Sequence, residues 1–336
     1  MKPILDDVLK DWGERIYRTS VRVRIGKRTV THSRTKSLPP LLQKVGSARI
    51  RNALAMTTSK APEVMVKISG GGKGMRHIKA HFDYISRNGK LELENENGEI
   101  IAGREAIRDL RDEWKYGQYG IPEEARYKEA FNVVLSMPPG TDRDAVTQAA
   151  RDFAHIEFSD NHAYVFTAHD DERHPHVHLC IKALGRDGTR LNPRKADLQR
   201  WRELFAETLR ERGIVANATP RTARAAVHRS EKQFVHHMRR RGRVFETAAT
   251  DVSLDQIQNS SSAQQRVIHA YGQIARELAK SDSADRKLAL AITSFVAQMP
   301  KVSMLRKREQ ESRYMHTKST GQNSLITRNE TLDQYR

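Results

Sequence analysis

The chain has 336 residues and a formal net charge of +18 at pH 7, with 59 Lys and Arg against 41 Asp and Glu. This excess predicts a polyanionic partner, nucleic acid first, because Lys and Arg that neutralise phosphates release counterions. No apolar run approaches the ~20 residues of a membrane-spanning helix, and the single Cys180 excludes an internal disulfide, so the sequence predicts a cytoplasmic protein without membrane insertion.

Residues 1–60 are basic and irregular, and we expect them to form an N-terminal arm or appendage. The first residues lack the apolar stretch of a signal peptide. Met56 lies just before the first predicted strand and is an alternative start site. A strand is predicted at 64–69, followed by the loop Gly70–Gly74. Its glycine spacing matches neither common nucleotide-binding pattern, which favours close approach to a nucleic-acid backbone, with Lys73 and Arg76 as DNA contacts.

A helix is predicted over residues 76–87, and it carries two stripes. One stripe is apolar with spacing i, i+4, i+7, which predicts burial against a core. The second repeats this spacing with polar side chains, and periodicity alone favours an ordinary solvated face. The two sets are Ile78, Phe82 and Ile85, and His77, His81 and Tyr84.

The remaining pattern mixes hairpins with single strands and helices, which argues for an α+β fold with a central, mostly antiparallel sheet flanked by helices. We expect this domain to span residues 61–220. The densely basic region beyond it predicts a helical C-terminal extension over 221–316, and the polar end at 317–336 is predicted to be disordered. Candidate DNA contacts in the extension are Arg239, Arg240 and Arg241.

A histidine-rich hairpin lies near the middle of the chain. Strand-like segments flank a short acidic turn, and alternation places His176 and His178 on one face, with His169 opposite His176. Three neutral imidazoles with an open position suit a catalytic divalent metal, although the same pattern fits a surface hairpin rich in histidine. His174 is an alternative third ligand if the strand begins before Pro175. Cys180 shares the HxH face and is expected to be a small buried residue.

Three segments, in order, resemble the Vir-type relaxases, which nick transfer origins and transfer-DNA borders. Residues 82–93 resemble that family's tyrosine motif, residues 133–141 its serine motif, and residues 169–178 its HxDxxxPHxH motif. The resemblance covers about residues 64–220. It implies a relaxase-like, HUH-type fold with a divalent metal (Mg, Mn or Zn).

The resemblance also implies roles for particular residues. The assignments are Tyr84 as nucleophile, His169, His176 and His178 as metal ligands, and Ser136 as a contact to the DNA near the nick. Residue chemistry adds Asp83, Asp171 and His81 as candidates to deprotonate Tyr84 or to orient a ligand histidine, and Arg87 as a candidate DNA contact. The chain departs from the family in carrying about eighty residues before Tyr84, and in having Arg173 where members often have an acid. The second departure leaves Asp171 as the better candidate base.

The implied function is nicking of one strand at a plasmid transfer origin, through a 5′-phosphotyrosyl intermediate, for conjugative transfer or mobilisation. The implied partners are single-stranded or melted origin DNA, an accessory origin-binding protein and a type IV coupling protein. Two alternatives stay open: a rolling-circle replication initiator with the same chemistry, and a non-catalytic DNA-binding module.

Overall fold

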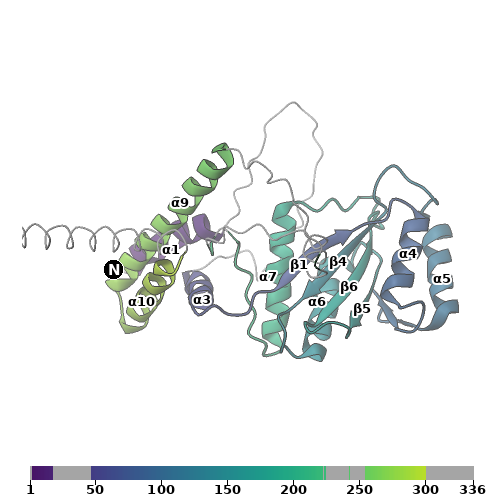
Figure 1. The fold of residues 1–336 in the computed structure, drawn as a ribbon, viewed down its shortest axis with the longest axis horizontal. Helices are drawn as coiled ribbons and strands as arrows, with labels where there is room; N and C mark the ends of the chain where they lie inside the picture. The colour runs from purple at the N-terminus through teal and green to yellow at the C-terminus, as the bar shows by residue number, and fades with distance from the viewer. Residues whose placement is uncertain (1, 18–46, 222, 225–241, 243–253, 300–336) are drawn as a thin grey trace, which may run out of the picture. The chain divides into compact units, whose positions relative to one another are not determined.

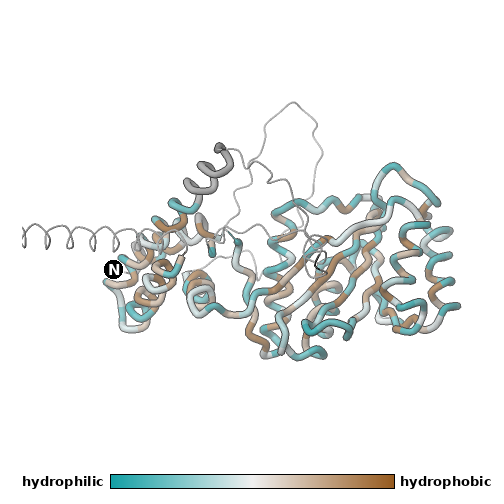
Figure 2. Tube along the Cα trace, in the orientation of Figure 1, coloured by the Kyte–Doolittle hydropathy of each residue, from teal (hydrophilic) through white to brown (hydrophobic). Residues whose placement is uncertain are grey.

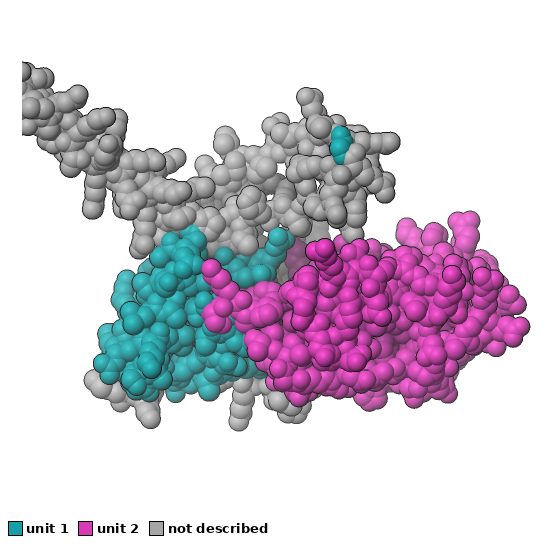
Figure 3. All heavy atoms as spheres, turned by 60° about the horizontal axis from the view of Figure 1, so that its bottom comes forward, with its two compact units in different colours: residues 1–18, 28–58, 220–336 teal, residues 19–27, 59–219 magenta. Residues whose placement is uncertain are grey.

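A computed structural model describes residues 2–17, 47–221, 223–224, 242 and 254–299. Their contacts divide them into two compact units, which Figure 3 colours separately. Residues 59–219 form one, here called the sheet unit, and the segments before and after it form the other, here called the helical unit. The candidate DNA contacts Arg239, Arg240 and Arg241 and the predicted tail at 317–336 lie outside the described residues.

The sheet unit is built on six strands in the order β1-β4-β6-β5-β2-β3, and every neighbouring pair is antiparallel. Figure 1 shows this sheet with helices on both sides. The prediction of an α+β fold with an antiparallel sheet flanked by helices is confirmed. The strands are β1 (Met65–Gly70), β2 (Leu93–Asn95), β3 (Ile100–Ile101), β4 (Ala130–Ser136), β5 (Tyr164–His169) and β6 (His176–Lys182).

One face of the sheet packs against α6 (Arg143–Phe158) and α7 (Lys195–Glu211). Alternate residues of the strands point into this layer, because successive strand side chains face opposite sides. The apolar residues in Figure 2 accordingly gather on the strands and on the helix sides that contact them. The centre of this core consists of Val133, Leu135, Val177, Leu179, Phe153, Trp201 and Phe205.

The opposite face is covered over part of its area by α4 (Met75–Ile85) and α5 (Gly103–Tyr116). The stripe Ile78, Phe82 and Ile85 is buried here as predicted, and Cys180 lies in the same core. Because Cys180 shares its face of β6 with His176 and His178, the histidines lie on the α4 side of the sheet. The fold therefore places α4, which carries Tyr84, and β6, which carries His176 and His178, so that these residues lie on the same side of the sheet.

The helical unit contains α1 (Lys2–Tyr17), α3 (Ser47–Thr58), α9 (Leu254–Ala279) and α10 (Ser283–Ala297). Residues 2–17 and 47–58 are thus helical, whereas the sequence suggested an irregular stretch there. Apolar residues of α1 recur at helical spacing but are separated by charges, and α1 packs on α3 and on α9, which is more than 200 residues away in the sequence. The shared core includes Leu5, Leu9, Ile16, Leu54, Tyr271, Ile274 and Ile292. Among the described residues, none of the helices has both the length and the apolar character of a membrane span.

Candidate active site

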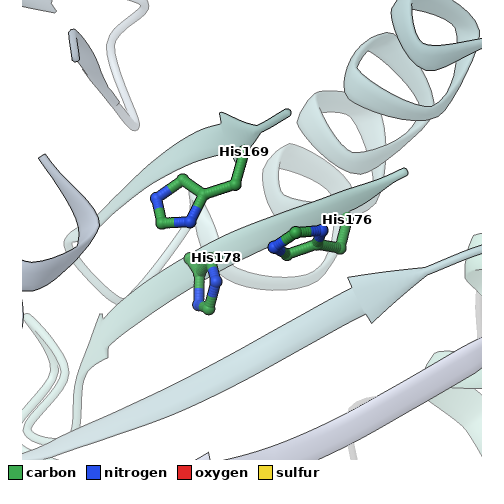
Figure 4. Close-up of side chains that lie close together, drawn as sticks. All are labelled: His169, His176 and His178. Atoms are coloured by element: carbon green, nitrogen blue, oxygen red, sulfur yellow. The ribbon is translucent and has the colours of Figure 1, made fainter. Parts of the chain in front are cut away.

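Three histidines converge at the end of the β5–β6 hairpin. His169 and His176 are paired across the two strands, and His178 follows on the same face of β6. All three side chains are buried, and one ring nitrogen from each lies within 4.8 Å of the others. Figure 4 shows the three rings gathered between the adjacent strands. The structure therefore brings together the three residues that the sequence nominates as metal ligands.

Backbone carbonyls fix the orientation of two of these rings. Nε2 of His169 lies 2.7 Å from the carbonyl oxygen of Ile85, so it donates its proton there and leaves Nδ1 as the available lone pair. Nδ1 of His176 lies 3.2 Å from the carbonyl oxygen of His174, which leaves Nε2 available. Histidines that bind metals commonly donate their other N–H in this way. The donor set thus fits a divalent metal.

Burial also keeps two of these rings, His169 and His178, uncharged. It lowers the pKa of His178 to about 3, with further lowering from the neighbouring His169 and His176. Burial likewise lowers the pKa of His169, although the hydrogen bond to Ile85 opposes the effect. At neutral pH both rings are therefore in the neutral form that a metal requires.

Tyr84 stands beside the histidines on the last turn of α4. Its side chain is 51% exposed. Its ring centroid lies 5.5 Å from that of His178 and 5.9 Å from that of His169, and both contacts are edge-on. A polymeric substrate can reach this tyrosine from solvent while its ring touches the cluster. This helix face is therefore solvated at Tyr84, as periodicity alone suggests, but it also contacts the histidine cluster.

His81 lies one turn before Tyr84 and stacks against its ring at 6.2 Å between centroids. Its Nε2 is buried and finds no hydrogen-bond partner among the described residues. Burial lowers the pKa of His81 to about 4, and the nearby His169 adds to the effect. His81 is therefore a neutral imidazole at pH 7, packed behind the tyrosine.

Arg87 and Asp171 close the other side of the cluster. The Arg87 guanidinium pairs with Asp171, lies 3.3 Å from Nδ1 of His169 and sits 5.3 Å from the centroid of Tyr84. One carboxylate oxygen of Asp171 is 3.7 Å from Nε2 of His176. Partial burial alone would raise the pKa of Asp171, but Arg87, His169, a backbone hydrogen bond and His176 together lower it by more, and the net shift is downward. Asp171 is thus a carboxylate engaged in an ion pair.

The other nominated residues lie at different distances from this centre. Ser136 pairs with His176 across β4 and β6, and it is only 3% exposed. Asp83 lies apart from the cluster, in an ion pair of 2.7 Å with Lys79. His174 precedes β6 and does not belong to the group of converging ligand atoms, because the strand begins at His176, after Pro175.

Two of the nominated DNA contacts lie at the opposite end of α4. Lys73 and Arg76 are exposed near its first turn, and Arg76 faces Glu124 at 3.4 Å. The preceding glycines pack against the chain itself, since an added Cβ at Gly74 would come within 2.2 Å of the Glu123 carbonyl oxygen. This close packing explains Gly74 without a bound phosphate.

Arg143 is a functional residue that sequence reasoning missed. At the start of α6, its guanidinium donates to the carbonyl oxygens of His169 and Glu172 and to the carboxylate of Asp170. These bonds hold the turn between the two histidine strands. Arg143 belongs to no local pattern with the hairpin, so only the folded chain shows this brace.

Comparison with known proteins shows which family this part of the chain resembles. Residues 84–214 match the relaxase family model described as MobA/VirD2-like, nuclease domain. Residues 84–214 of the sheet unit are therefore similar to the MobA/VirD2-like relaxases. This confirms the resemblance drawn from the three motifs. The matched residues begin at Tyr84 and include the whole histidine hairpin of the sheet unit.

Three curated relatives are each described as the T-DNA border endonuclease VirD2. The chain is 29% identical to the one from Rhizobium radiobacter over 187 residues, and 28% identical to the one from Agrobacterium fabrum over 186 residues. Each match covers 50% of this chain but only 44% and 42% of the two relatives, so the chain spans less than half of their length. No solved structure matches the chain.

We expect the metal-free protein to lose stability as the pH falls below about 6.5, the ordinary pKa of histidine. Below this pH the histidines of the unfolded chain are protonated, whereas in the folded protein His81 and His178 stay neutral until about pH 4 and about pH 3. The free energy of unfolding therefore decreases with acidification. Urea denaturation in EDTA across this range measures the effect. His81→Phe should flatten the dependence relative to the same change at exposed His155, and parallel curves for His81→Phe and the parent contradict the expectation.

We also expect Arg87→Ala to raise the affinity for Mn²⁺ or Zn²⁺. The guanidinium occupies the lone pair of His169 Nδ1, the nitrogen that a metal requires, and it adds a positive charge beside the site. A hydrogen bond to a charged group contributes about 1.5 kcal/mol or more, so the gain should be about ten-fold. Calorimetric titration measures it, with Arg108→Ala on α5 as the control. Unchanged or weaker binding in Arg87→Ala contradicts this role.

Proposed function

We propose that the protein is a relaxase, a site- and strand-specific DNA endonuclease that nicks one strand at a plasmid transfer origin by metal-assisted tyrosine transesterification. The observation that carries the proposal is the placement of exposed Tyr84 within 5.5 Å and 5.9 Å of two of three converging histidines. The family match of residues 84–214 supports it, as does the identity to VirD2 proteins described as T-DNA border endonucleases.

In the proposed reaction the hydroxyl oxygen of Tyr84 attacks the scissile phosphorus. A bond forms between this oxygen and phosphorus, and the bond from phosphorus to the 3′ oxygen breaks. The tyrosine loses its proton and the departing 3′ oxygen gains one. The products are a 5′-phosphotyrosyl linkage and a free 3′-hydroxyl. No water is consumed, so the reverse reaction can rejoin the strand, as transfer for conjugation or mobilisation requires.

His169, His176 and His178 are the residues that would hold a divalent ion, Mg, Mn or Zn, and three imidazoles favour a transition metal over Mg. When bound, such an ion supplies charge neutralisation and polarisation at the phosphate. The chain contributes the ring orientations, through the carbonyls of Ile85 and His174.

A phenol is a weak nucleophile at neutral pH unless its proton is taken up or its phenolate is stabilised. The two nearby proton acceptors, His81 and Asp171, both have lowered pKa values and are weak bases. The guanidinium of Arg87 lies 5.3 Å from the ring centroid of Tyr84. We therefore assign to Arg87 stabilisation of the phenolate and of the phosphate charge.

The remaining roles extend the same proposal. The low exposure of Ser136 and its pairing with His176 favour a part in positioning this ligand near the nick over broad contact with DNA. The proposed substrate is single-stranded or locally melted origin DNA. The proposed protein partners are an accessory origin-binding protein and a type IV coupling protein.

The test is incubation of the full chain with a labelled origin oligonucleotide and Mg²⁺, Mn²⁺ or Zn²⁺. We expect a covalent protein–DNA adduct that resists denaturation, together with a free 3′-hydroxyl fragment. Salt-sensitive DNA binding without an adduct or a nick under any of these metals would instead support a non-catalytic DNA-binding module.

A further inference from the structure

A basic cavity lies beside α4, away from the histidine cluster. It measures about 340 Å³ and is open to solvent between α4 and α5. Lys79 and Asp83 line it from α4, and Asn88 lines it just beyond the end of that helix. Its charged lining from α5 consists of Arg104, Arg108 and Arg111. Because Asp83 and Asn88 flank Tyr84 in the chain, this cavity is separated from the candidate active site by little more than the width of one helix, about 10 Å.

The arginines belong to a longer row on α5. Residues 104, 108, 111 and 115 recur at i, i+4, i+7 and i+11, so they share one side of the helix, and we call Arg104, Arg108, Arg111 and Lys115 the α5 cation row. At 1.5 Å per residue the row is about 16 Å long. The acidic residues of the helix, at 105, 109, 112 and 113, lie beside this row rather than in it.

The charges along this row are only partly compensated. Arg111 pairs with Asp112 and Lys115 with Glu123. Arg104 donates to the backbone carbonyl of Asn88, a neutral group. Arg108 is exposed and has no ion-pair partner among the described residues. The two residues nearest to the active-site end of the row therefore keep unneutralised positive charge.

Exposed aromatic side chains follow at the far end of the row. Tyr116, Tyr119 and Tyr127 are 73%, 45% and 63% exposed, and all lie at or after the end of α5, in the connection to β4. Cations accompany two of them. Lys115 Nζ is 4.9 Å from the centroid of Tyr116, and Arg126 Cζ is 5.6 Å from that of Tyr127.

Exposed aromatics beside cations have a specific use in nucleic-acid binding. Bases that are free of a duplex stack on aromatic faces, and adjacent Lys and Arg follow the phosphates, with little dependence on sequence. A duplex cannot offer its stacked bases in this way. A buried aromatic would instead indicate a packing role, and these three tyrosines are not buried.

We propose that the α5 cation row and the tyrosines of the following connection bind single-stranded DNA that leads away from the nick. Phosphates lie along Arg104 and Arg108, and bases stack on Tyr119 and Tyr127. The connection packs on the loop before α4, where the amide of Ala125 donates to the carbonyl of Lys73. This brings the nominated DNA contact Lys73 to the same end of the track. The inference rests on the proposed function, since it names the surface that holds the flanking strand.

The test measures binding by fluorescence anisotropy in the Tyr84→Phe background, so that no adduct forms. Labelled single strands of two lengths are used, one ending near the nick and one extended by about ten nucleotides to each side. For the long strand, Arg104→Ala/Arg108→Ala should weaken binding and lower the salt slope by about 1.4, at about 0.7 for each lost phosphate contact. Tyr119→Ala/Tyr127→Ala should cost about five-fold or more per base, whereas the Phe versions keep stacking and affinity.

A matched control removes the same charge elsewhere in the sheet unit. Arg210→Ala/Arg212→Ala changes two arginines of α7 and its end, which packs on the other face of the sheet. The proposal is overturned if the α5 variants lose no more affinity than this control, if short and long strands lose equally, or if duplex DNA binds as well as the single strand. Absence of an adduct in the parent protein would overturn the relaxase assignment instead, and binding in the Tyr84→Phe background is independent of that result.

Discussion

Replacement of Tyr84 by Phe is expected to abolish the covalent adduct while leaving DNA binding intact. The change removes only the hydroxyl that attacks phosphorus and keeps the ring that contacts His169 and His178. Loss of a covalent nucleophile leaves no alternative route to the same intermediate, so adduct formation should fall by at least about 10³-fold. Denaturing gels of labelled oligonucleotide give the rate, and anisotropy gives the affinity.

The matched control is Tyr116→Phe, which removes the same group from another exposed tyrosine of the sheet unit. It should retain full activity. Because Tyr84 is half exposed, its loss of a hydroxyl should change the free energy of unfolding by no more than about 0.5 kcal/mol. An adduct that persists in Tyr84→Phe at the parent rate would remove Tyr84 from the role of nucleophile.

The double change His176→Ala/His178→Ala is expected to remove both metal binding and nicking. It leaves His169 as the single member of the group of ligand atoms that lie within 4.8 Å of one another. One imidazole cannot hold a divalent ion in competition with water, so the metal affinity should fall by at least about 10³-fold. Calorimetric titration and elemental analysis of the purified protein measure this directly.

A pair of single variants separates the two candidates for the third ligand. His174 lies 5.2 Å from His176 between ring centroids but outside the converging group, whereas His169 is inside it. His169→Ala should therefore weaken metal binding strongly, and His174→Ala should leave it within about three-fold, or below ~1 kcal/mol. Equal losses in the two variants, or a larger loss in His174→Ala, would reassign the ligand.

The histidine hairpin was accessible from the sequence because a strand has a side-chain period of two. With a short turn and apolar residues on the opposite face, the pairing of His169 with His176 has one favourable register. The apolar stripe of α4 could be predicted because side chains spaced i, i+4 and i+7 lie on one side of a helix. Local periodicity therefore predicted the sheet class, the buried Cys180 and the convergence of three imidazoles.

Contacts between distant segments were not accessible in this way. Arg87 pairs with Asp171 from 84 residues away, and Arg143 braces a turn that begins 26 residues later. Arg87 was nominated only as a DNA contact, and nothing near Arg143 distinguishes it from the other cations of a basic chain. Asp83 is the opposite case. Its position next to Tyr84 suggested that it assists the tyrosine, but its side chain forms an ion pair with Lys79. The helices of residues 2–17 and 47–58 escaped prediction because their buried partners lie far along the sequence.

The hydrogen bond from His169 Nε2 to the carbonyl of Ile85 links two parts of the reaction centre that the chain separates widely. Ile85 is the last residue of α4 and follows Tyr84 directly. The carbonyl oxygen of Ile85 thus fixes which ring nitrogen of His169 carries the proton. The same contact fixes the distance of the Tyr84 ring from the sheet. Insertions in the intervening hairpin or in α5 leave this alignment unchanged, whereas adding or deleting one residue between positions 81 and 85 rotates the phenol by about 100°. The spacing between the tyrosine and histidine motifs can therefore vary freely, while the phase of α4 cannot.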